Sequence, residues 1–551
     1  MRASRYVLER IVPYGLLTAQ VDAETKRIMK FDEIQRKSKS LTKWLRLHGY
    51  GRGCTIGLLS RNSLDFAWIL LGIWESGAVC HLIDFRYTLR EVIHALETAP
   101  VDALILQRGV FQTLACSETE QIKHIFEFGE ENVPYSEAAT PLDTIFKFEI
   151  SVDCMAEPSE GTKSPEMENE PDPLVLILSS SGTTGLPKGV MHTEDSIFSG
   201  LELGSSNILV QDDDKTIGLL PFHHVFGLSV MLNCLCAGAL MVVMPKFSLP
   251  FWIETIKTFS ITRLHLVPSL LMTLMKSNAL DFRDLLSVKH VCVGGAPMFE
   301  DRIERYMDKF QQPVVIQKLY GCTECFYYLF SQMYDAKRPG SLGRVTPSLH
   351  VKIVDLKSRE IVGPNSVGEI CIKGRPVTKG YINNPNVNAC AFDADRWFLT
   401  GDLGYFDEDG YFYFVDRFKN IIKYQGNQVS PSELEFVLIA HPNIVEAAVI
   451  AIEHEVFGQV PRAFVSPREI HDNTAQEIHD YIRSVLAPFK LLRGGLVFTC
   501  SIPKTSSGKV QRHSLHNMVV QKIHFDLKMK TFDQAEVDKK LQKACYHKPT
   551  A

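Results

Sequence analysis

The chain has 551 residues, 45% of them hydrophobic and 22% charged, and its formal net charge is −5. A chain of this length is too long for one compact core and predicts two or more domains. The composition is typical of a globular protein. Because the balance is slightly acidic, no basic field favours a nucleic acid, and we expect no nucleic-acid partner.

The termini and the longest uncharged run bear on location. Residues 1–15, MRASRYVLERIVPYG, lack the apolar core of a secretory signal. The run Leu228–Met244 is interrupted by Asn233 and Gly238 and closed by Pro245, so it predicts a buried helix and strand rather than a membrane span. The last residues, KPTA, differ from a Ser-Lys-Leu peroxisomal address. We therefore expect a cytoplasmic protein without an integral membrane segment, and favour the peroxisome less.

Strand-like and helix-like segments alternate through the first four hundred residues. The strand-like runs include Cys54–Ser60, Asp102–Gln107, Leu174–Ser179 and His290–Gly295, and Leu89–Thr98 has helical spacing. This alternation predicts α/β layers in which helices cover sheets. The acidic, proline-rich stretch Met155–Pro173 predicts an exposed loop within the same large domain.

The pattern changes near Val351, where short strands with turn signals predict a β-rich module (VKIVD, GEICIKG and GYFYFVD). From about residue 420, helix-like and strand-like segments predict a small α+β domain (PSELEFVLIAHP, VEAAVIAI and EIHDYIRSVL). We therefore predict a multi-domain α/β protein. Residues 1–416 form a large N-terminal domain of layered α/β subdomains plus the β-rich module. Residues 417–551 form a small mobile domain, with a hinge near 416–419 and a charged tail at about 521–551, either a solvated helix or a frayed end.

The stretch SSSGTTGLPKGV, Ser179–Val190, follows an apolar strand and gathers hydroxyls, glycines and one lysine. It is not a Walker A loop, because Leu186 and Pro187 separate the glycine from the lysine. Its glycines let backbone N–H groups converge on phosphate oxygens, and its hydroxyls add donors. A flexible turn is the plainer alternative, but the strand–loop–lysine order favours phosphate binding. The candidate residues are Ser180, Ser181, Gly182, Thr183, Thr184, Gly185 and Lys188.

Eight motifs in collinear order resemble those of the adenylate-forming (AMP-binding) superfamily. Its members include acyl-CoA synthetases, 4-coumarate-CoA ligases, beetle luciferases and peptide-synthetase adenylation domains. SSGTTGLPKG matches the family signature without a substitution. The other motifs are PFHHVFGL (221–228), VGGAPM (293–298), YGCTE (320–324), GEICIKG (368–374), FLTGD (398–402), VDRFKNIIKYQGNQVSPSELE (415–435) and PKTSSGKVQR (503–512).

The resemblance implies a reaction in which a carboxylic acid is activated by ATP and Mg²⁺. Bringing a carboxylate against a phosphate requires cations and oriented dipoles, because both groups are negative. Thr323 and Glu324 are implied as the magnesium site, through a hydroxyl and a hard carboxylate oxygen. Asp402 is implied to bind the ribose hydroxyls, with Arg417 supporting it. The implied adenine and AMP contacts are Gly294, Gly295, Ala296, Tyr320 and Gly321.

Lys509, in TSSGK, is implied to bridge the substrate carboxylate and the α-phosphate. The implied acyl pocket contains His224, Phe226, Gly295 and Cys322, where His224 would bind the carboxylate or gate its entry. Plainer alternatives remain at each place. Lys509 would then be an exposed lysine, His224 a hydrogen-bonded core histidine, and Asp402 with Arg417 a surface ion pair.

Lys423 and Gly426 resemble the face that receives CoA once the small domain has rotated on its hinge. We therefore expect an acid-CoA ligase that uses ATP, Mg²⁺ and CoA on a hydrophobic fatty or aryl acid, as a monomer or weak dimer. The alternatives are a luciferase-like enzyme and a catalytically silent binder. Val230, where beetle luciferases usually carry a hydroxyl residue, and the bulky CFYY at 325–328 both argue against a luciferin-shaped pocket.

Overall fold

The chain divides into two compact units, Met1–Thr400 with Tyr405–Tyr413 and Gly401–Gly404 with Phe414–Ala551. The domain boundary predicted at residue 416 and its hinge stay predictions. A computed structural model describes residues 3–110, 122, 124–129, 139–142, 144–145, 172–180, 188–204, 210–275, 277, 280–296, 303, 307–424, 427–454, 457–471, 474–505 and 508–518. The predicted loop at Met155–Pro173, apart from its last two residues, and the predicted tail lie outside these ranges.

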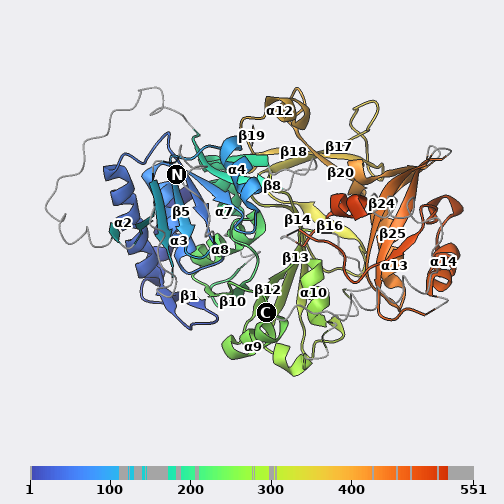
Figure 1. Cartoon of the computed structure of the whole chain (residues 1–551), viewed down its shortest axis with the longest axis horizontal. Helices are drawn as coiled ribbons and strands as arrows, with labels where there is room; N and C mark the ends of the chain where they lie inside the picture. Colours follow the sequence, from blue (N-terminus) through green and yellow to red (C-terminus); the bar gives the residue numbers. More distant parts are fainter. Residues whose placement is uncertain are drawn as a thin grey trace. The chain divides into compact units, whose positions relative to one another are not determined.

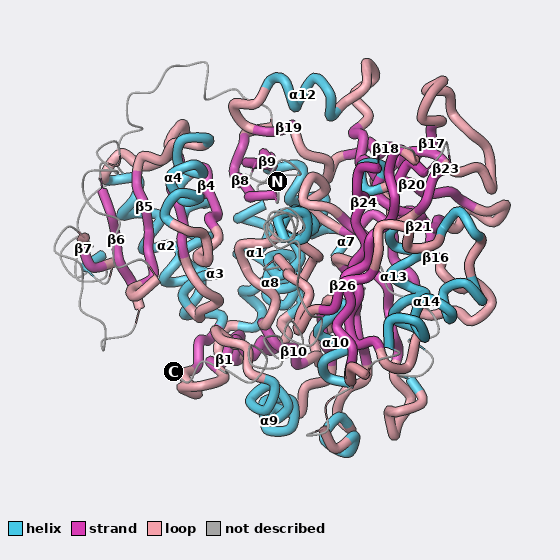
Figure 2. The backbone as a smooth tube through the Cα atoms, turned by 45° about the vertical axis from the view of Figure 1, so that its right-hand side comes forward, coloured by secondary structure: helices cyan, strands magenta, loops and turns pink. Residues whose placement is uncertain are grey.

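The first unit contains an eight-stranded sheet with the order β19-β9-β8-β4-β3-β5-β6-β7. Its strands are β3 (Thr55–Leu59), β4 (Val79–Ile83), β5 (Ala103–Gln107), β6 (His124–Phe128), β7 (Thr140–Pro141), β8 (Leu174–Ser180), β9 (Lys188–Thr193) and β19 (Gly380–Tyr381). The strands from β8 through β7 are parallel, and β9 and β19 extend the sheet antiparallel at one edge. Figure 2 shows β5, β6 and β7 side by side. The predicted strands at 54–60, 102–107 and 174–179 are confirmed.

A thirteen-stranded sheet has the order β17-β18-β20-β21-β16-β15-β14-β13-β12-β10-β11-β1-β2. Its strands are β1 (Thr18–Asp22), β2 (Ile28–Lys30), β10 (Lys215–Gly218), β11 (Leu240–Val243), β12 (Arg263–Leu266), β13 (His290–Gly294), β14 (Val315–Gly321), β15 (Tyr328–Met333), β16 (Ser341–Val345), β17 (Leu349–Val354), β18 (Gly368–Gly374), β20 (Phe398–Phe406) and β21 (Phe412–Arg417). The strands from β1 to β14 in this order are parallel, whereas β14, β15 and β16 pair antiparallel. The short strands from β17 onward confirm the predicted β-rich module.

The helices of the first unit pack around these two sheets. They include α1 (Ala3–Ile11), α2 (Phe31–Leu47), α3 (Asp65–Ser76), α4 (Leu89–Thr98), α7 (Glu194–Gly204), α8 (Val225–Ala237), α9 (Leu249–Phe259), α10 (Pro268–Met275) and α12 (Pro385–Ala391). One apolar core joins α1, α2, α3, α7 and α8 to strands of both sheets. Figures 1 and 2 both place α8 between β8 and β10.

Local sequence explains where two of these helices begin or end. α4 begins with a capping box, in which the side chains of Thr88 and Glu91 each accept from the other's backbone N–H. α8 ends at Ala237, the capping residue Gly238 has a left-handed φ of 78°, and β11 begins two residues later at Leu240. The uncharged run from Leu228 is therefore a buried helix and strand, as predicted. No helix in the described ranges is long and apolar enough to cross a membrane.

The second unit has a five-stranded sheet with apolar residues on both faces. Its elements are β22 (Ile422–Tyr424), β23 (Asn427–Val429), α13 (Pro431–Ala440), β24 (Ile444–His454), β25 (Gly458–Pro467), α14 (Thr474–Val485) and β26 (Leu496–Phe498). Along β24, Ala447 and Val449 pack in one core with residues of α13 and α14. The intervening Ala448 and Ile450 pack with Ile502 and Leu515 in another. This alternation follows from the pleat of the strand, and the predicted α+β architecture is confirmed.

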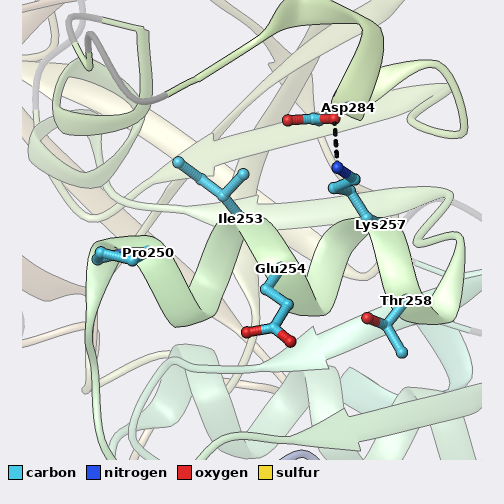
Figure 3. Close-up of a pocket in the computed structure, with 6 residues that line it drawn as sticks. All are labelled: Pro250, Ile253, Glu254, Lys257, Thr258 and Asp284. Atoms are coloured by element: carbon cyan, nitrogen blue, oxygen red, sulfur yellow. Dashed lines mark ion pairs between the residues drawn. The ribbon is translucent and has the colours of Figure 1, made fainter.

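A buried ion pair fixes the start of two central strands in the first unit. Asp214 precedes β10, and its Oδ2 accepts from the Arg263 Nε of β12 at 2.6 Å. The second carboxylate oxygen accepts from the Thr262 hydroxyl at 2.8 Å. By contrast, the 3.0 Å pair between Lys257 and Asp284 lies at a surface hollow, where the lysine side chain is 57% exposed (Figure 3).

We expect Asp214→Ala to lower the free energy of unfolding by about 3–5 kcal/mol, because it removes the carboxylate that pairs with the buried Arg263 guanidinium. Asp284→Ala is the matched control at the exposed pair, and we expect a loss below about 1 kcal/mol. Urea denaturation followed by tryptophan fluorescence measures both. Equal losses in the two variants would contradict the structural role assigned to the buried pair.

Candidate active site

Three of the parallel strands carry candidate residues at their carboxyl ends. β13 ends at Gly294, and β14 ends at Gly321, next to Thr323 and Glu324. The loop after β10 leads to His224, the N-cap residue of α8. Because the carboxyl ends of parallel strands meet at one edge, these residues share one edge of the thirteen-stranded sheet.

The glycines at this edge leave room for neighbouring groups. A Cβ atom on Gly294 would lie 2.8 Å from the Leu319 carbonyl oxygen and 3.5 Å from the Phe226 ring. Phe226 therefore lies against Gly294. Gly295 follows with a φ of +84°, a conformation that favours glycine, and Ala296 comes directly after it.

The segment after β14 is partly buried. The Tyr320 ring packs 5.4 Å from the Phe330 ring, between centroids. The Cys322 carbonyl accepts from the Cys325 N–H at 3.2 Å, which closes a turn around Thr323 and Glu324. Thr323 is buried. The two predicted magnesium ligands, Thr323 and Glu324, are therefore the two central residues of this turn.

The predicted phosphate loop connects two paired strand ends. Ser180, the last residue of β8, pairs with Lys188, the first residue of β9. Ser181, Gly182, Thr183, Thr184 and Gly185 lie outside the described residues. The Lys188 Nζ lies 5.4 Å from the centroid of the Tyr381 ring. The Tyr381 hydroxyl donates to the Glu324 Oε1 at 2.8 Å. One tyrosine therefore brings the loop lysine and the candidate metal ligand together.

A buried histidine, His192, forms a hydrogen bond with the backbone of the same turn. The His192 Nε2 lies 2.8 Å from the Thr323 carbonyl oxygen, and since a carbonyl only accepts, this nitrogen carries the proton. The Nδ1 lies 3.3 Å from the Ser196 hydroxyl oxygen. Burial lowers the pKa of His192 to about 4, although the bond to Thr323 opposes the shift. The ring is therefore neutral at pH 7.

His223, rather than His224, lies in a buried charged cluster. Its Nε2 is 3.0 Å from the Arg86 Nη2 and 3.3 Å from the Asp84 Oδ2. Burial by itself would raise the pKa of Asp84, but His223 and Arg86 outweigh it and hold this pKa well below its usual range. His224 is half-buried, with extended backbone at the start of α8. The sequence resemblance singled out the second histidine and missed the role of the first.

Asn62, which follows β3, holds the loop that leads to these histidines. Its Nδ2 donates to the carbonyl oxygens of Gly218 and Leu220, each at 2.9 Å. Its Oδ1 accepts from the Phe222 N–H, also at 2.9 Å. Three hydrogen bonds from one buried side chain therefore fix the backbone ahead of His224.

The second unit holds five further candidates. The Arg417 Nε lies 2.9 Å from the Asp402 Oδ1, and Asp402 is only 3% exposed, unlike a carboxylate of a surface pair. Lys423 is exposed on β22, and Gly426 lies outside the described residues. Lys509 lies in a tight loop, where its N–H donates to the Thr505 hydroxyl at 3.1 Å and its carbonyl accepts from the Thr505 N–H at 2.7 Å. The roles of these residues stay predictions.

Comparison with known proteins defines the class. The AMP-binding enzyme family matches residues 14–382, and the AMP-binding enzyme C-terminal domain matches residues 433–509. The chain is 34% identical to 4-coumarate-CoA ligase 3 of Oryza sativa subsp. japonica, covering 94% of this chain and 92% of that protein. It is 32% identical to luciferin 4-monooxygenase of Nipponoluciola cruciata, covering 94% and 93%.

A solved structure shares the fold. The anthranilate CoA ligase AuaEII in complex with anthranoyl-AMP has a TM-score of 0.81 and 24% sequence identity, covering 94% of this chain and 97% of that one. The protein therefore belongs to the AMP-binding, adenylate-forming enzymes. Its relatives within that family include 4-coumarate-CoA ligases and luciferases, which confirms the resemblance found in the sequence.

The neutral state of His192 predicts a pH dependence of stability. Its folded pKa of about 4 lies below the usual 6.5, so between these values only the unfolded chain binds the proton. The contribution of His192 to the free energy of unfolding is therefore fully present above about pH 6.5, and it is lost as the pH falls toward 4. This one residue accounts for about 2 kcal/mol between pH 7.5 and pH 5.

We expect His192→Gln, which keeps an N–H donor for Thr323, to weaken this loss, as measured by urea midpoints at pH 7.5 and pH 5. His350→Gln, at an exposed position of β17, is the control and should keep the loss of the wild type. The assignment is wrong if the His192 variant keeps the full loss too.

Proposed function

We propose that this protein is an AMP-forming acid-CoA ligase that activates a hydrophobic carboxylic acid, fatty or aryl, and transfers it to CoA. The proposal rests on one observation: Lys188 and Glu324 both contact the side chain of Tyr381, and Glu324 lies in the same turn as Thr323. A lysine for phosphate and a carboxylate for a metal are what a MgATP site requires. The ligase relatives, matched over nearly the whole chain, support the second step.

Thr323 and Glu324 fit a magnesium ion by the chemistry of their oxygens. Within the described residues, the hydrogen bonding of the Glu324 carboxylate is confined to Oε1, which accepts from Tyr381. Magnesium is usually held by one or two carboxylates together with substrate phosphates. When bound there, it would supply positive charge to the phosphate oxygens of ATP.

In the first step that we propose, an oxygen of the acid attacks the α-phosphorus of ATP, and pyrophosphate leaves with the electrons of the broken P–O bond. Lys188 and the backbone N–H groups of its loop hold phosphate oxygens. Lys509 offsets the negative charge shared by the carboxylate and the α-phosphate. Asp402 accepts hydrogen bonds from the ribose hydroxyls, with Arg417 fixing its carboxylate.

In the second step, the CoA thiol loses its proton to water and its sulfur attacks the acyl carbon. The bond from this carbon to the phosphate oxygen then breaks and AMP leaves with its electrons, which completes the thioester. Lys423 and Gly426 are the candidates for contacting CoA. His224 and Phe226, with Gly295 and Cys322, are the candidates for the acyl pocket. A cytoplasmic location and a monomeric or weakly dimeric state belong to the same proposal and rest on the sequence alone.

A luciferase-like activity is the second candidate, because luciferin 4-monooxygenases are among the relatives at 32% identity. Two features favour the ligase. Val230 is a buried apolar residue of α8. The four side chains of CFYY are all buried, and the ring centroids of Tyr327 and Tyr328 lie 4.1 Å apart with the two ring planes tilted by 39°. Both are the departures from the beetle luciferase pattern that the sequence shows, and in the structure both are buried.

The product of ATP tests the reaction class. With MgATP, CoA and a panel of fatty and aryl acids, we expect AMP, pyrophosphate and an acyl-CoA thioester, all measurable by chromatography. ADP as product would contradict the proposal. AMP release with oxygen uptake and without thioester would favour the luciferase-like alternative, and no acid-dependent turnover would favour a silent binder.

Lys509 and Lys423 should each serve one half-reaction. An interaction that is made in only one transition state lowers the barrier of that step alone. We expect Lys509→Ala to reduce acid-dependent ATP–pyrophosphate exchange by about 100-fold or more. The same variant should still convert supplied acyl-adenylate and CoA to thioester. Lys423→Ala should keep exchange and slow thioester formation, so that each variant controls for the other. Equal slowing of both steps in both variants would contradict this division.

A further inference from the structure

One short segment, Thr378–Ile382, holds both the main chain and the side chain of Glu324. The Thr378 N–H donates to the Glu324 carbonyl at 2.8 Å. Three residues on, the Tyr381 hydroxyl donates to the Glu324 Oε1, also at 2.8 Å. With two anchors from one segment, the carboxylate cannot rotate without breaking the second bond.

The same segment is bound to the strand that begins at Lys188. Tyr381 pairs with Val190 in the β19–β9 ladder, and the Ile382 N–H donates to the Gly189 carbonyl at 2.9 Å. A Cβ atom on Gly189 would lie 2.7 Å from the Ile382 side chain, so the two strands approach closely. Lys188 and Glu324 are therefore positioned by a common element.

The backbone of Tyr381 is itself clamped by a helix. Asn388 of α12 accepts from the Tyr381 N–H at 2.7 Å and donates to the Tyr381 carbonyl at 2.8 Å. The tyrosine is only 8% exposed. A side chain held at both backbone groups and buried over its ring has little freedom, so its hydroxyl is presented to Glu324 in one direction.

The side chain of Tyr381 also contacts two opposite charges, one at its ring and one at its hydroxyl. The Lys188 ammonium lies over its face, and the Glu324 carboxylate lies at its hydroxyl. In the part of the chain that the structure describes, no ion pair joins Lys188 to Glu324. A direct pair would neutralise the cation meant for phosphate and the anion meant for metal. A neutral donor orients the carboxylate and leaves its charge intact.

We propose that Tyr381 is a positioning residue that holds Glu324 ready for magnesium and keeps it apart from Lys188. The inference rests on the proposed function and adds a residue that the sequence motifs do not point to. Tyr381 touches neither ATP nor the acid in this role, and acts through Glu324 and Lys188.

Tyr381→Phe tests the hydroxyl alone, because the ring that Lys188 contacts remains. We expect the Mg²⁺ concentration for half-maximal ATP–pyrophosphate exchange to rise about 10-fold, with a much smaller change in rate at saturating Mg²⁺. Binding of Mn²⁺ in the presence of ATP, measured by electron paramagnetic resonance without any acid, should weaken by a similar factor. Tyr381→Leu removes the ring as well, and should in addition raise the KM for ATP.

Tyr413→Phe is the matched control. The Tyr413 hydroxyl donates to the Asp407 Oδ2 at 2.9 Å, so this variant loses the same kind of hydrogen bond in the same unit. It should keep the Mg²⁺ requirement and Mn²⁺ affinity of the wild type. A wild-type Mg²⁺ requirement and Mn²⁺ affinity in Tyr381→Phe would overturn the inference while leaving the ligase proposal intact. If the wild type shows no exchange with any acid, the ligase proposal fails, and the Mn²⁺ measurement still decides the role of Tyr381.

Discussion

Hydrogen bonds that cross from the eight-stranded sheet to the thirteen-stranded sheet govern the geometry of the candidate site. The site draws residues from both sheets, so a small shift of one against the other would separate them. His192 of β9 donates to Thr323 beyond β14, and Tyr381 of β19 donates to Glu324. Asn62, after β3, holds the loop that follows β10. Each bond joins the end of an element in one sheet to a loop of the other.

Most of these crossing bonds use neutral donors, which suits a buried boundary between sheets. A charged group there would need a counter-charge to offset its loss of water. His192 meets this condition by staying neutral, and Asn62 and Tyr381 meet it by their chemistry. The exception is the cluster of Asp84, Arg86 and His223, in which Arg86 and His223 both lie against the Asp84 carboxylate and offset its charge. None of these crossing bonds pairs Lys188 or Glu324 with an opposite charge, which agrees with the ligand-binding roles proposed for the two residues.

Local sequence patterns were enough to find the fold and most of the motif positions. The helix Leu89–Thr98 and the strand Gly368–Gly374 have in the structure the bounds that the sequence indicated, because their periodicity and caps act within a few residues. Asn62, His192 and Tyr381 were missed. Their partners lie 156, 131 and 57 residues away, and no local spacing records such a contact. Of the three, only His192 had a local signal, because it is a polar residue in an apolar strand. The same pattern is equally typical of a core histidine with no role in a site.

The two-faced sheet of the second unit has a consequence for shortened chains. Residues 502–515, which carry Lys509, also cover one apolar face of β24 and β25 through Ile502 and Leu515. Arg512 ties this segment to α13 by a 2.6 Å contact with Glu435. A chain cut by a protease or a stop codon before Ile502 therefore loses more than a lysine. It exposes a strip of Ala448, Ile450 and Phe464 to water, and such a surface leads to aggregation rather than to a folded, inactive enzyme.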